Sequence, residues 1–277
     1  MTVRQDAFFL PVGDASCFCV WRAPPSGAPV RGTIVHLPAF GEEMNKSRRM
    51  TALAARALGA CGFAVLQLDP RGTGDSDGEF ADATLERWTA DLVAGIAWAR
   101  TNVHAPLWLW ALRTGALFAA PVLASLGTPA SMLLWQPVQS GAQFVTHLLR
   151  QKHAADLADA GPGALAALRD ELTARPVDIG GYTITPALAG ALNGATLALS
   201  PGAVERVAWL ELTSATPPTL SPAARTKVAA LRSEGIPVAA RAVGGPSFWQ
   251  SVEIEEAPAL IDATCAALTD TTLFEHA

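Results

Sequence analysis

Residues 107–116 place a charged side chain where a folded protein can do chemistry. They read Leu-Trp-Leu-Trp-Ala-Leu-Arg-Thr-Gly-Ala: an apolar run, a turn containing small residues, and the start of an alanine- and leucine-rich stretch. A strand that enters a helix through such a turn has the layout of a nucleophile elbow, which exposes the side chain at its tip. Ala111 and Gly115 take the small positions, and Arg113 takes the tip. A guanidinium is not a nucleophile, but it binds carboxylates and phosphates.

Arg113 needs an anionic partner. A cation at the start of a helix meets the positive end of the helix dipole, which costs roughly 0.3–1 kcal/mol when exposed. Glu42 and Glu43 follow the strand predicted at residues 31–36 and are the nearest carboxylates by topology, with Asp75 next. We favour a buried Arg–Glu pair that closes the pocket, because buried charges are usually paired. The alternative is an arginine-lined site for an anionic or carbohydrate ligand.

The other residues of a hydrolytic triad are missing from their usual places. An acid would follow the strand at 204–212, but residues 213–217 contain no carboxylate. The base would follow the strand at 237–243, but residues 243–249 contain no histidine, and none of the five histidines has the expected place in the chain. No clustered histidine and aspartate pattern suggests a metal, and we expect no cofactor.

A rearranged catalytic set stays open, because geometry and not sequence order defines such a site. Its nucleophile would be Ser47, Ser140, Ser214 or Ser247, and its base would be His36 or His147.

Further pocket candidates lie near strand ends or in the loops that follow them: His36, Phe40, Trp110 and Trp249. Aromatic faces there could stack on sugar rings, although core packing is the commoner role of each tryptophan. Lys46, Arg48 and Arg49 could bind a phosphate or carboxylate, but a solvated helix face is the commoner explanation of so short a cluster.

Alternating strands and helices predict an α/β fold. Such alternation implies a mostly parallel sheet with helices on both faces. We expect residues 15–23 and 31–36 to form a hairpin that adds an antiparallel edge. The predicted strands after that are 63–68, 106–110, 132–135, 204–212 and 237–243, and the predicted helices are 47–61, 82–101, 116–126, 222–234 and 255–268.

The alternation stops between residues 136 and 204. Glycines and helix-like pieces, such as residues 144–160, occupy this segment. We interpret it as a mainly helical cap over the carboxyl edge of the sheet. The expected organisation is therefore a core of residues 1–136 and 204–277 with a cap or lid insertion at 137–203.

Composition narrows the function classes. The chain has 277 residues, of which 50% are hydrophobic, and a net charge of -5, so a large core is affordable and nucleic acid is not an expected partner. Four cysteines without C-x-x-C spacing are expected to be reduced thiols. No secretory signal is visible, and Arg113 interrupts the apolar stretch at 107–126, so we expect a cytoplasmic protein with no transmembrane segment. A homo-oligomer is left open.

Two further motifs carry a family resemblance. Residues 69–76, Asp-Pro-Arg-Gly-Thr-Gly-Asp-Ser, look like the D-x-R-G-x-G-x-S turn common in α/β-hydrolases, and residues 35–41 occupy the loop that helps to form the oxyanion hole there. With the elbow, these segments resemble the α/β-hydrolase superfamily. Residues 40–50, the arginine-bearing elbow and Phe248-Trp249 resemble the second of two hydrolase-like families associated with exosortase A systems. That resemblance implies a setting of exopolysaccharide production and protein sorting in Gram-negative bacteria.

Two functions therefore stay in competition. The first is a catalytically degenerate hydrolase-fold protein that binds a ligand, such as a small molecule, a carbohydrate or an anion, or a partner in such a system. The second is an active esterase-like hydrolase or acyl-transfer enzyme with a rearranged nucleophile.

Overall fold

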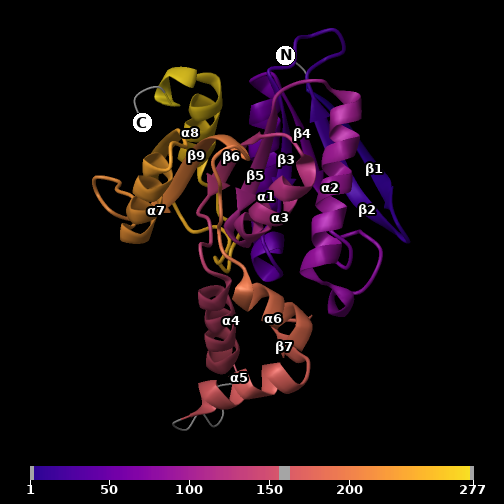
Figure 1. Ribbon diagram of the computed structural model, residues 1–277, viewed down its shortest axis with the longest axis vertical. Coiled ribbons are helices and arrows are strands. Elements are labelled where there is room, and N and C mark those ends of the chain that lie inside the picture. Colours follow the sequence, from indigo (N-terminus) through magenta and orange to yellow (C-terminus); the bar gives the residue numbers. More distant parts are fainter. Residues whose placement is uncertain (1–2, 156–162, 275–277) are drawn as a thin grey trace.

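The computed structural model describes residues 3–155 and 163–274 and has the α/β-hydrolase fold that the sequence predicts. A twisted central sheet has helices on both faces, and a group of helices lies together at one end of it (Figure 1). Residues 156–160 of the helix-like piece predicted at 144–160, and residues 161–162 of the predicted cap, lie outside the described part.

Eight strands of the described chain form the sheet, in the order β1-β2-β4-β3-β5-β6-β9-β10. From β4 onward along this order the neighbouring strands are parallel, whereas β1 and β2 pair antiparallel with each other and β2 pairs antiparallel with β4. The strands are β1 Arg4–Val12, β2 Ala15–Ala23, β3 Gly32–Leu37, β4 Phe63–Leu68, β5 Leu107–Leu112, β6 Ala130–Trp135, β9 Val204–Thr213 and β10 Val238–Gly244.

The predicted hairpin between residues 15–23 and 31–36 is wrong. Both strands exist, but β2 pairs with β1 and β4, and β3 lies between β4 and β5. The hairpin is made by β1 and β2, which meet around Gly13 at a φ of 61°. Strand β1 lies at the sheet edge and much of it is exposed; its polar start, Arg4-Gln5-Asp6, and Pro11 interrupt the strand pattern, and proline is tolerated at such an edge.

The helices divide between the two faces of the sheet. Helices α1 (Glu42–Ala60) and α8 (Pro258–Thr269) share one hydrophobic cluster with alternate residues of the inner strands. Helices α2 (Leu85–Asn102), α3 (Ala119–Leu126) and α7 (Pro222–Ser233) share the other. Strands β3, β5 and β6 are buried along their whole length, as expected of parallel strands covered on both sides.

The segment between β6 and β9 leaves the sheet at the carboxyl end of β6. It contains α4 (Gly141–Ala155), α5 (Ala164–Ala174), the short hairpin of β7 (Val177–Ile179) and β8 (Tyr182–Ile184), and α6 (Pro186–Gly194). Figure 1 shows these elements gathered below the sheet. Ring contacts of Phe144 with Phe40 and of Tyr182 with Phe80 attach them to the core, at centroid distances of 5.7 and 4.9 Å. In the part of the chain that the structure describes, no helix is both long and apolar enough to cross a bilayer.

Candidate functional site

The turn after β5 has the elbow geometry, with Arg113 at its tip. Strand β5 runs to Leu112, two residues beyond its predicted end, and Arg113 follows with a φ of 52°. A left-handed conformation costs a residue other than glycine roughly 1–2 kcal/mol, so surrounding contacts must hold it. A 3₁₀ turn, Arg113–Phe118, comes next, and α3 begins only at Ala119. The α-helix predicted from residue 116 therefore starts three residues later.

Gly115 allows the elbow to approach the loop after β3. A Cβ at this position would lie 2.1 Å from the carbonyl oxygen of Leu37 and 2.9 Å from that of Pro38. The backbone N–H of Phe40 donates to the hydroxyl of Thr114 at 2.8 Å. The elbow and the loop that would form an oxyanion hole are thus in direct backbone contact.

The Arg113 guanidinium pairs with Glu43, one of the two carboxylates that the sequence suggested. Its Nη2 lies 2.9 Å and its Nε 3.2 Å from Oε1 of Glu43, and the two side chains are only 17% and 11% exposed. Its Nη1 donates to the carbonyl oxygen of Gln136 at 3.4 Å, and its Cζ lies 5.0 Å from the ring centroid of Trp249. Glu42 points elsewhere, with a side chain that is 54% exposed and 3.9 Å from Lys46.

The position of Glu43 suits its charge. It lies in the first turn of α1, where the helix dipole favours an anion. Arg113 belongs instead to a short 3₁₀ turn, so the dipole penalty expected from a helix start is limited. The pair is held on one side by a strand-end turn and on the other by a helix N-terminus.

The residues that follow β6 form hydrogen bonds with the elbow. Gln136, like Arg113, has a positive φ, at 43°. Its side-chain oxygen accepts the backbone N–H of Leu212 at 2.9 Å, and the backbone N–H of Val138 donates to the carbonyl oxygen of Arg113 at 3.0 Å. These contacts fix the backbone conformation that aims Arg113 at Glu43.

At the acid position, sequence reasoning missed Glu211. It lies inside β9 near its carboxyl end, is 5% exposed, and accepts the backbone N–H of Ser221 at 2.8 Å and its hydroxyl at 3.2 Å. It therefore anchors the start of α7. A carboxylate within the apolar run at residues 207–212 was the available signal. At the usual position of the catalytic histidine the chain has instead Phe248 and Trp249, and both are buried.

A cavity of about 490 Å³ adjoins Arg113. It opens between the elbow, the loop at residues 136–140, helix α4 and the start of α7. Eight of its twelve lining residues have polar or charged side chains, namely Arg113, Gln136, Gln139, Ser140, Gln143, His147, Glu211 and Ser221, and Phe144 and Val138 are among the apolar members.

The cavity brings together two residues of the rearranged catalytic set, Ser140 and His147. Within the described residues no hydrogen bond joins them, and the hydroxyl of Ser140 accepts the backbone N–H of Gln143 at 3.4 Å. The other candidate nucleophiles do not line this cavity: Ser47 donates to the carbonyl oxygen of Glu43, Ser214 is exposed in the loop after β9, and Ser247 is half-buried in the loop after β10.

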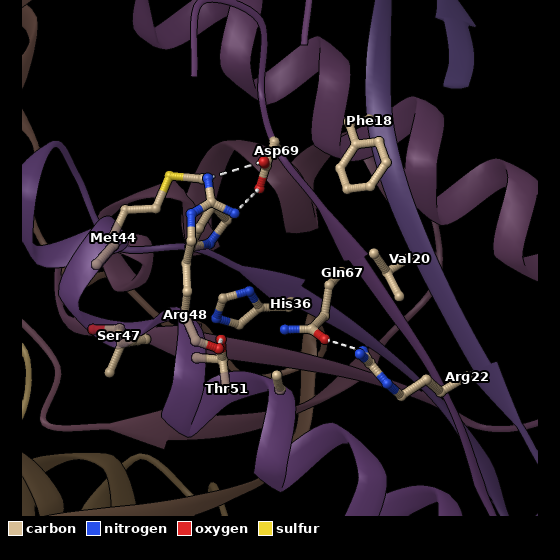
Figure 2. Close-up of a pocket in the computed structure, with 14 residues that line it drawn as sticks. Phe18, Val20, Arg22, His36, Met44, Ser47, Arg48, Thr51, Gln67 and Asp69 are labelled. Carbon is tan, nitrogen blue, oxygen red and sulfur yellow. Dashed lines mark hydrogen bonds and ion pairs between the residues drawn. The ribbon is translucent and has the colours of Figure 1, made fainter. Parts of the chain in front are cut away.

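The remaining pocket candidates have separate locations. Phe40 is buried in an aromatic cluster with Phe80 and Trp88. Trp110 is completely buried, because β5 continues two residues past it. The centroid of its ring lies 4.6 Å from that of the His36 ring. His36 faces a different cavity under α1 (Figure 2).

The three basic residues of the predicted cluster at the start of α1 are paired. Arg48 contacts Asp69 at 3.0 Å, Arg49 pairs with Glu256, and Lys46 lies 3.9 Å from Glu42. Within the described residues, no group of three or more histidine, cysteine, aspartate or glutamate side chains could hold a metal ion.

The turn at residues 69–76 has a structural role, since its side chains form hydrogen bonds with neighbouring elements. Arg71 donates to Asp91 at 2.8 Å, and Asp91 is completely buried. The hydroxyl of Ser76 donates to the carbonyl oxygen of Asp69 at 2.6 Å and accepts the backbone N–H of Phe18 at 2.8 Å. These contacts fasten the turn to β2 and α2.

Solved structures align with the chain over nearly its whole length. Est1E from Butyrivibrio proteoclasticus with ferulic acid bound is 14% identical, with a TM-score of 0.65 over 95% of this chain and 98% of that one. A proline iminopeptidase-related protein from Thermus thermophilus is 19% identical, with a TM-score of 0.58 over 99% and 100%. An α/β serine hydrolase without a lid from Xanthomonas campestris is 16% identical, with a TM-score of 0.54 over 97% and 94%. No family model and no curated protein matches the chain. At these identities the likeness shows the fold, which is that of the α/β-hydrolases.

Proposed function

We propose that this chain is a non-hydrolytic α/β-hydrolase-fold protein that binds a carbohydrate in the cytoplasm, in a bacterial system associated with exosortase and exopolysaccharide. The observation that carries the proposal is the ion pair of Arg113 with Glu43 on the elbow. A hydrolase places a nucleophile there, beside a base that takes its proton. In this chain a guanidinium fills the position and is held by a carboxylate, a carbonyl oxygen and an indole ring.

The cavity beside Arg113 supports a carbohydrate as the ligand class. Amides at Gln136, Gln139 and Gln143 and the hydroxyl of Ser140 offer donors and acceptors together, which matches the hydroxyl groups of a sugar. Phe144 also lines the cavity, but its ring is buried against Phe40, so the polar side chains carry the recognition of the ligand. The setting rests on the resemblance of residues 40–50 and Phe248-Trp249 to the exosortase-associated family.

An active enzyme with a rearranged nucleophile is the second candidate. The observation that favours it is that Ser140 and His147 line one cavity with Glu211. Its geometry is poor, because seven residues along a helix correspond to about 10 Å at a rise of 1.5 Å per residue, beyond hydrogen-bond reach. Moreover, Glu211 already accepts both hydrogen bonds from Ser221.

A fluorophosphonate probe followed by intact-mass measurement separates the two candidates. We expect no stoichiometric adduct on the wild-type chain under conditions that label an active serine esterase completely. A single adduct that disappears in the variant Ser140→Ala would support the enzyme and overturn the non-hydrolytic proposal.

Calorimetric titration with neutral and acidic sugars tests the binding role. Gln143→Ala removes an amide from the cavity and should weaken binding about tenfold, which corresponds to the loss of roughly 1.4 kcal/mol of binding free energy. Gln151→Ala, on an exposed position of the same helix α4, is the matched control and should bind as the wild type does. Equal weakening in both variants, or no binding of any sugar tested, would contradict the carbohydrate assignment.

A further inference from the structure

A second cavity, of about 180 Å³, lies between α1 and strands β2, β3 and β4 (Figure 2). It shares no lining residue with the cavity beside Arg113. The pairing register of three strands determines which residues form the floor of this cavity. Val20 of β2 lies opposite Gln67 of β4, and Gln67 lies opposite His36 of β3. Arg22 lies two residues beyond Val20 and therefore on the same face of β2. Polar groups of three adjacent strands thus meet under a helix.

Arg22 is a buried cation among neutral acceptors. It is 5% exposed, its Nε donates to the side-chain oxygen of Gln5 at 3.0 Å, and its Nη1 donates to that of Gln67. In the described part of the chain no carboxylate lies within 4.0 Å of it. Burial, and after it the charge of Arg56, lowers the pKa of Arg22. Buried charges are normally paired with an opposite charge. An anionic ligand would therefore complete the surroundings of this guanidinium.

His36 is the second unsatisfied group. Its side chain points into the same cavity, and its Nε2 is buried without a hydrogen-bond partner. Burial, and next the charge of Arg48, lowers the pKa of His36 to about 3, so the ring is neutral at physiological pH. A neutral imidazole carries one N–H donor, and in the Nε2–H tautomer that donor is the unpartnered atom that a ligand would satisfy.

Gln67 is oriented so that it adds donors of the same kind. A guanidinium only donates, so the amide atom of Gln67 that contacts Arg22 must be its oxygen. The amide nitrogen is then left on the side of His36, as Figure 2 shows. The floor of the cavity thus presents donors from Arg22, Gln67 and His36.

The other charged lining residues neutralise each other. Arg48 and Asp69 form a two-pronged pair, with Nη2 3.0 Å from Oδ2 and Nη1 3.3 Å from Oδ1. Arg48 is partly exposed, with 43% of its side chain accessible. One uncompensated positive charge remains, that of Arg22. Much of the other lining is apolar, including Phe18, Val20, Ala39 and Met44.

We propose that this cavity binds a short-chain monocarboxylate, with the carboxylate on the donors of Arg22, Gln67 and His36 and the hydrocarbon chain against Phe18, Val20 and Met44. One net positive charge matches a monoanion, and the apolar walls match a short aliphatic chain better than a fully hydrated inorganic anion such as phosphate. The charge-assisted contact with Arg22 supplies the strongest single interaction. This site is independent of the carbohydrate-binding role proposed for the cavity beside Arg113.

Sodium butyrate is the probe. We would titrate it into the wild-type chain at constant ionic strength, by calorimetry and by following the imidazole nitrogen resonances of His36. The expected result is saturable binding with a dissociation constant of about 1 mM or tighter, the range accessible to so few atoms, together with movement of the Nε2 resonance. 1-Butanol, which has the same chain without the charge, and inorganic phosphate should each bind at least tenfold more weakly.

The variant Gln67→Glu locates the site. Its new carboxylate would pair with Arg22 and take the place of the ligand, so butyrate affinity should fall at least tenfold. Gln151→Glu, an exposed change of the same charge on α4, is the matched control and should leave affinity unchanged.

The proposal is overturned if butyrate gives no saturable signal, if Gln67→Glu binds it as the wild type does, or if butanol or phosphate binds equally well. Should Gln67→Glu fail to fold, the comparison of butyrate with butanol and phosphate on the wild-type chain still decides.

Discussion

Arg113 and Glu43, seventy residues apart in the sequence, meet with Nη2 2.9 Å from Oε1 at the point where β5 leaves the sheet. The carbonyl oxygen of Gln136 and the ring of Trp249 complete the surroundings of the guanidinium. Together these contacts hold Arg113 at a φ of 52°, a conformation that its side chain disfavours. The strain that in a hydrolase exposes a nucleophile here presents a cation to a carboxylate.

Replacing Arg113 should separate this strain from the ion pair. Arg113→Ala and Arg113→Gly both remove the guanidinium, but only glycine adopts a φ of 52° without strain. We expect both variants to be less stable than the wild type, and Arg113→Gly to be the more stable of the two by about 1 kcal/mol. Chemical denaturation measures the difference. Equal stability of the two variants would show that the elbow is not strained at this residue.

Gly115→Ala should disrupt the contact between the elbow and the loop after β3. The new Cβ would lie 2.1 Å from a backbone oxygen, which cannot move away as a flexible side chain could. We expect a loss of about 3 kcal/mol or more in the free energy of unfolding. Gly190→Ala, at an exposed position within α6 that has nothing within 4 Å, is the control and should stabilise the chain by about 0.5–1 kcal/mol. A tolerated Gly115→Ala would mean that the backbone approach is looser than the structure indicates.

Buried His36 should make stability depend on pH. Its folded pKa of about 3 lies below its ordinary value of 6.5, so between these values the unfolded chain binds a proton that the folded chain does not. The stabilisation is fully present above pH 6.5 and is lost as pH falls toward 3, by on the order of 5 kcal/mol. Asp69, whose pKa burial raises, contributes with the opposite sign, but it is common to wild type and variant.

Denaturation curves of His36→Gln across this pH range check the prediction. The variant should lose less stability than the wild type on acidification, whereas the exposed His104→Gln should follow the wild-type curve. Parallel curves for His36→Gln and the wild type would show that His36 takes up its proton as easily in the folded chain as in the unfolded one.

The pair of Arg71 with Asp91 should hold the turn at residues 69–76. Asp91→Asn leaves the shape of the side chain but removes the buried charge, and we expect a cost of about 3–5 kcal/mol. Asp14 contacts the same guanidinium at 3.1 Å but is 91% exposed, so Asp14→Asn should change stability far less than Asp91→Asn does. Similar effects of the two substitutions, measured by urea denaturation, would contradict this role of burial.

Apolar runs made the inner part of the fold predictable. Strand β4 has its predicted bounds, and the elbow was recognisable because its strand, small residues and following turn are contiguous in sequence. The edge strand β1 was missed because it begins with three polar residues and contains Pro11, and with it the true hairpin partner of β2 was missed.

Contacts in the candidate site could be predicted only where the order of strands and loops along the chain brings the residues together. The partner of Arg113 could be narrowed to two adjacent glutamates, but which one faces it depends on the rotation of α1. Glu211 was overlooked because it lies inside β9 and not in the loop after it. The row of Val20, Gln67 and His36 depends on the register of three strands, two of them antiparallel, which no local sequence pattern specifies.

A double-mutant cycle on Arg113 and Glu43 is the most direct measurement of whether an ion pair has replaced the nucleophile as the element that organises the elbow. Arg113→Ala and Glu43→Ala should each cost about 3–5 kcal/mol, because each leaves a largely buried charge without its partner. The double variant should cost less than the sum, with a coupling energy of about 1–3 kcal/mol. If the two single effects add to within about 0.5 kcal/mol, the two side chains do not stabilise each other, and the claim that their ion pair organises the elbow is wrong.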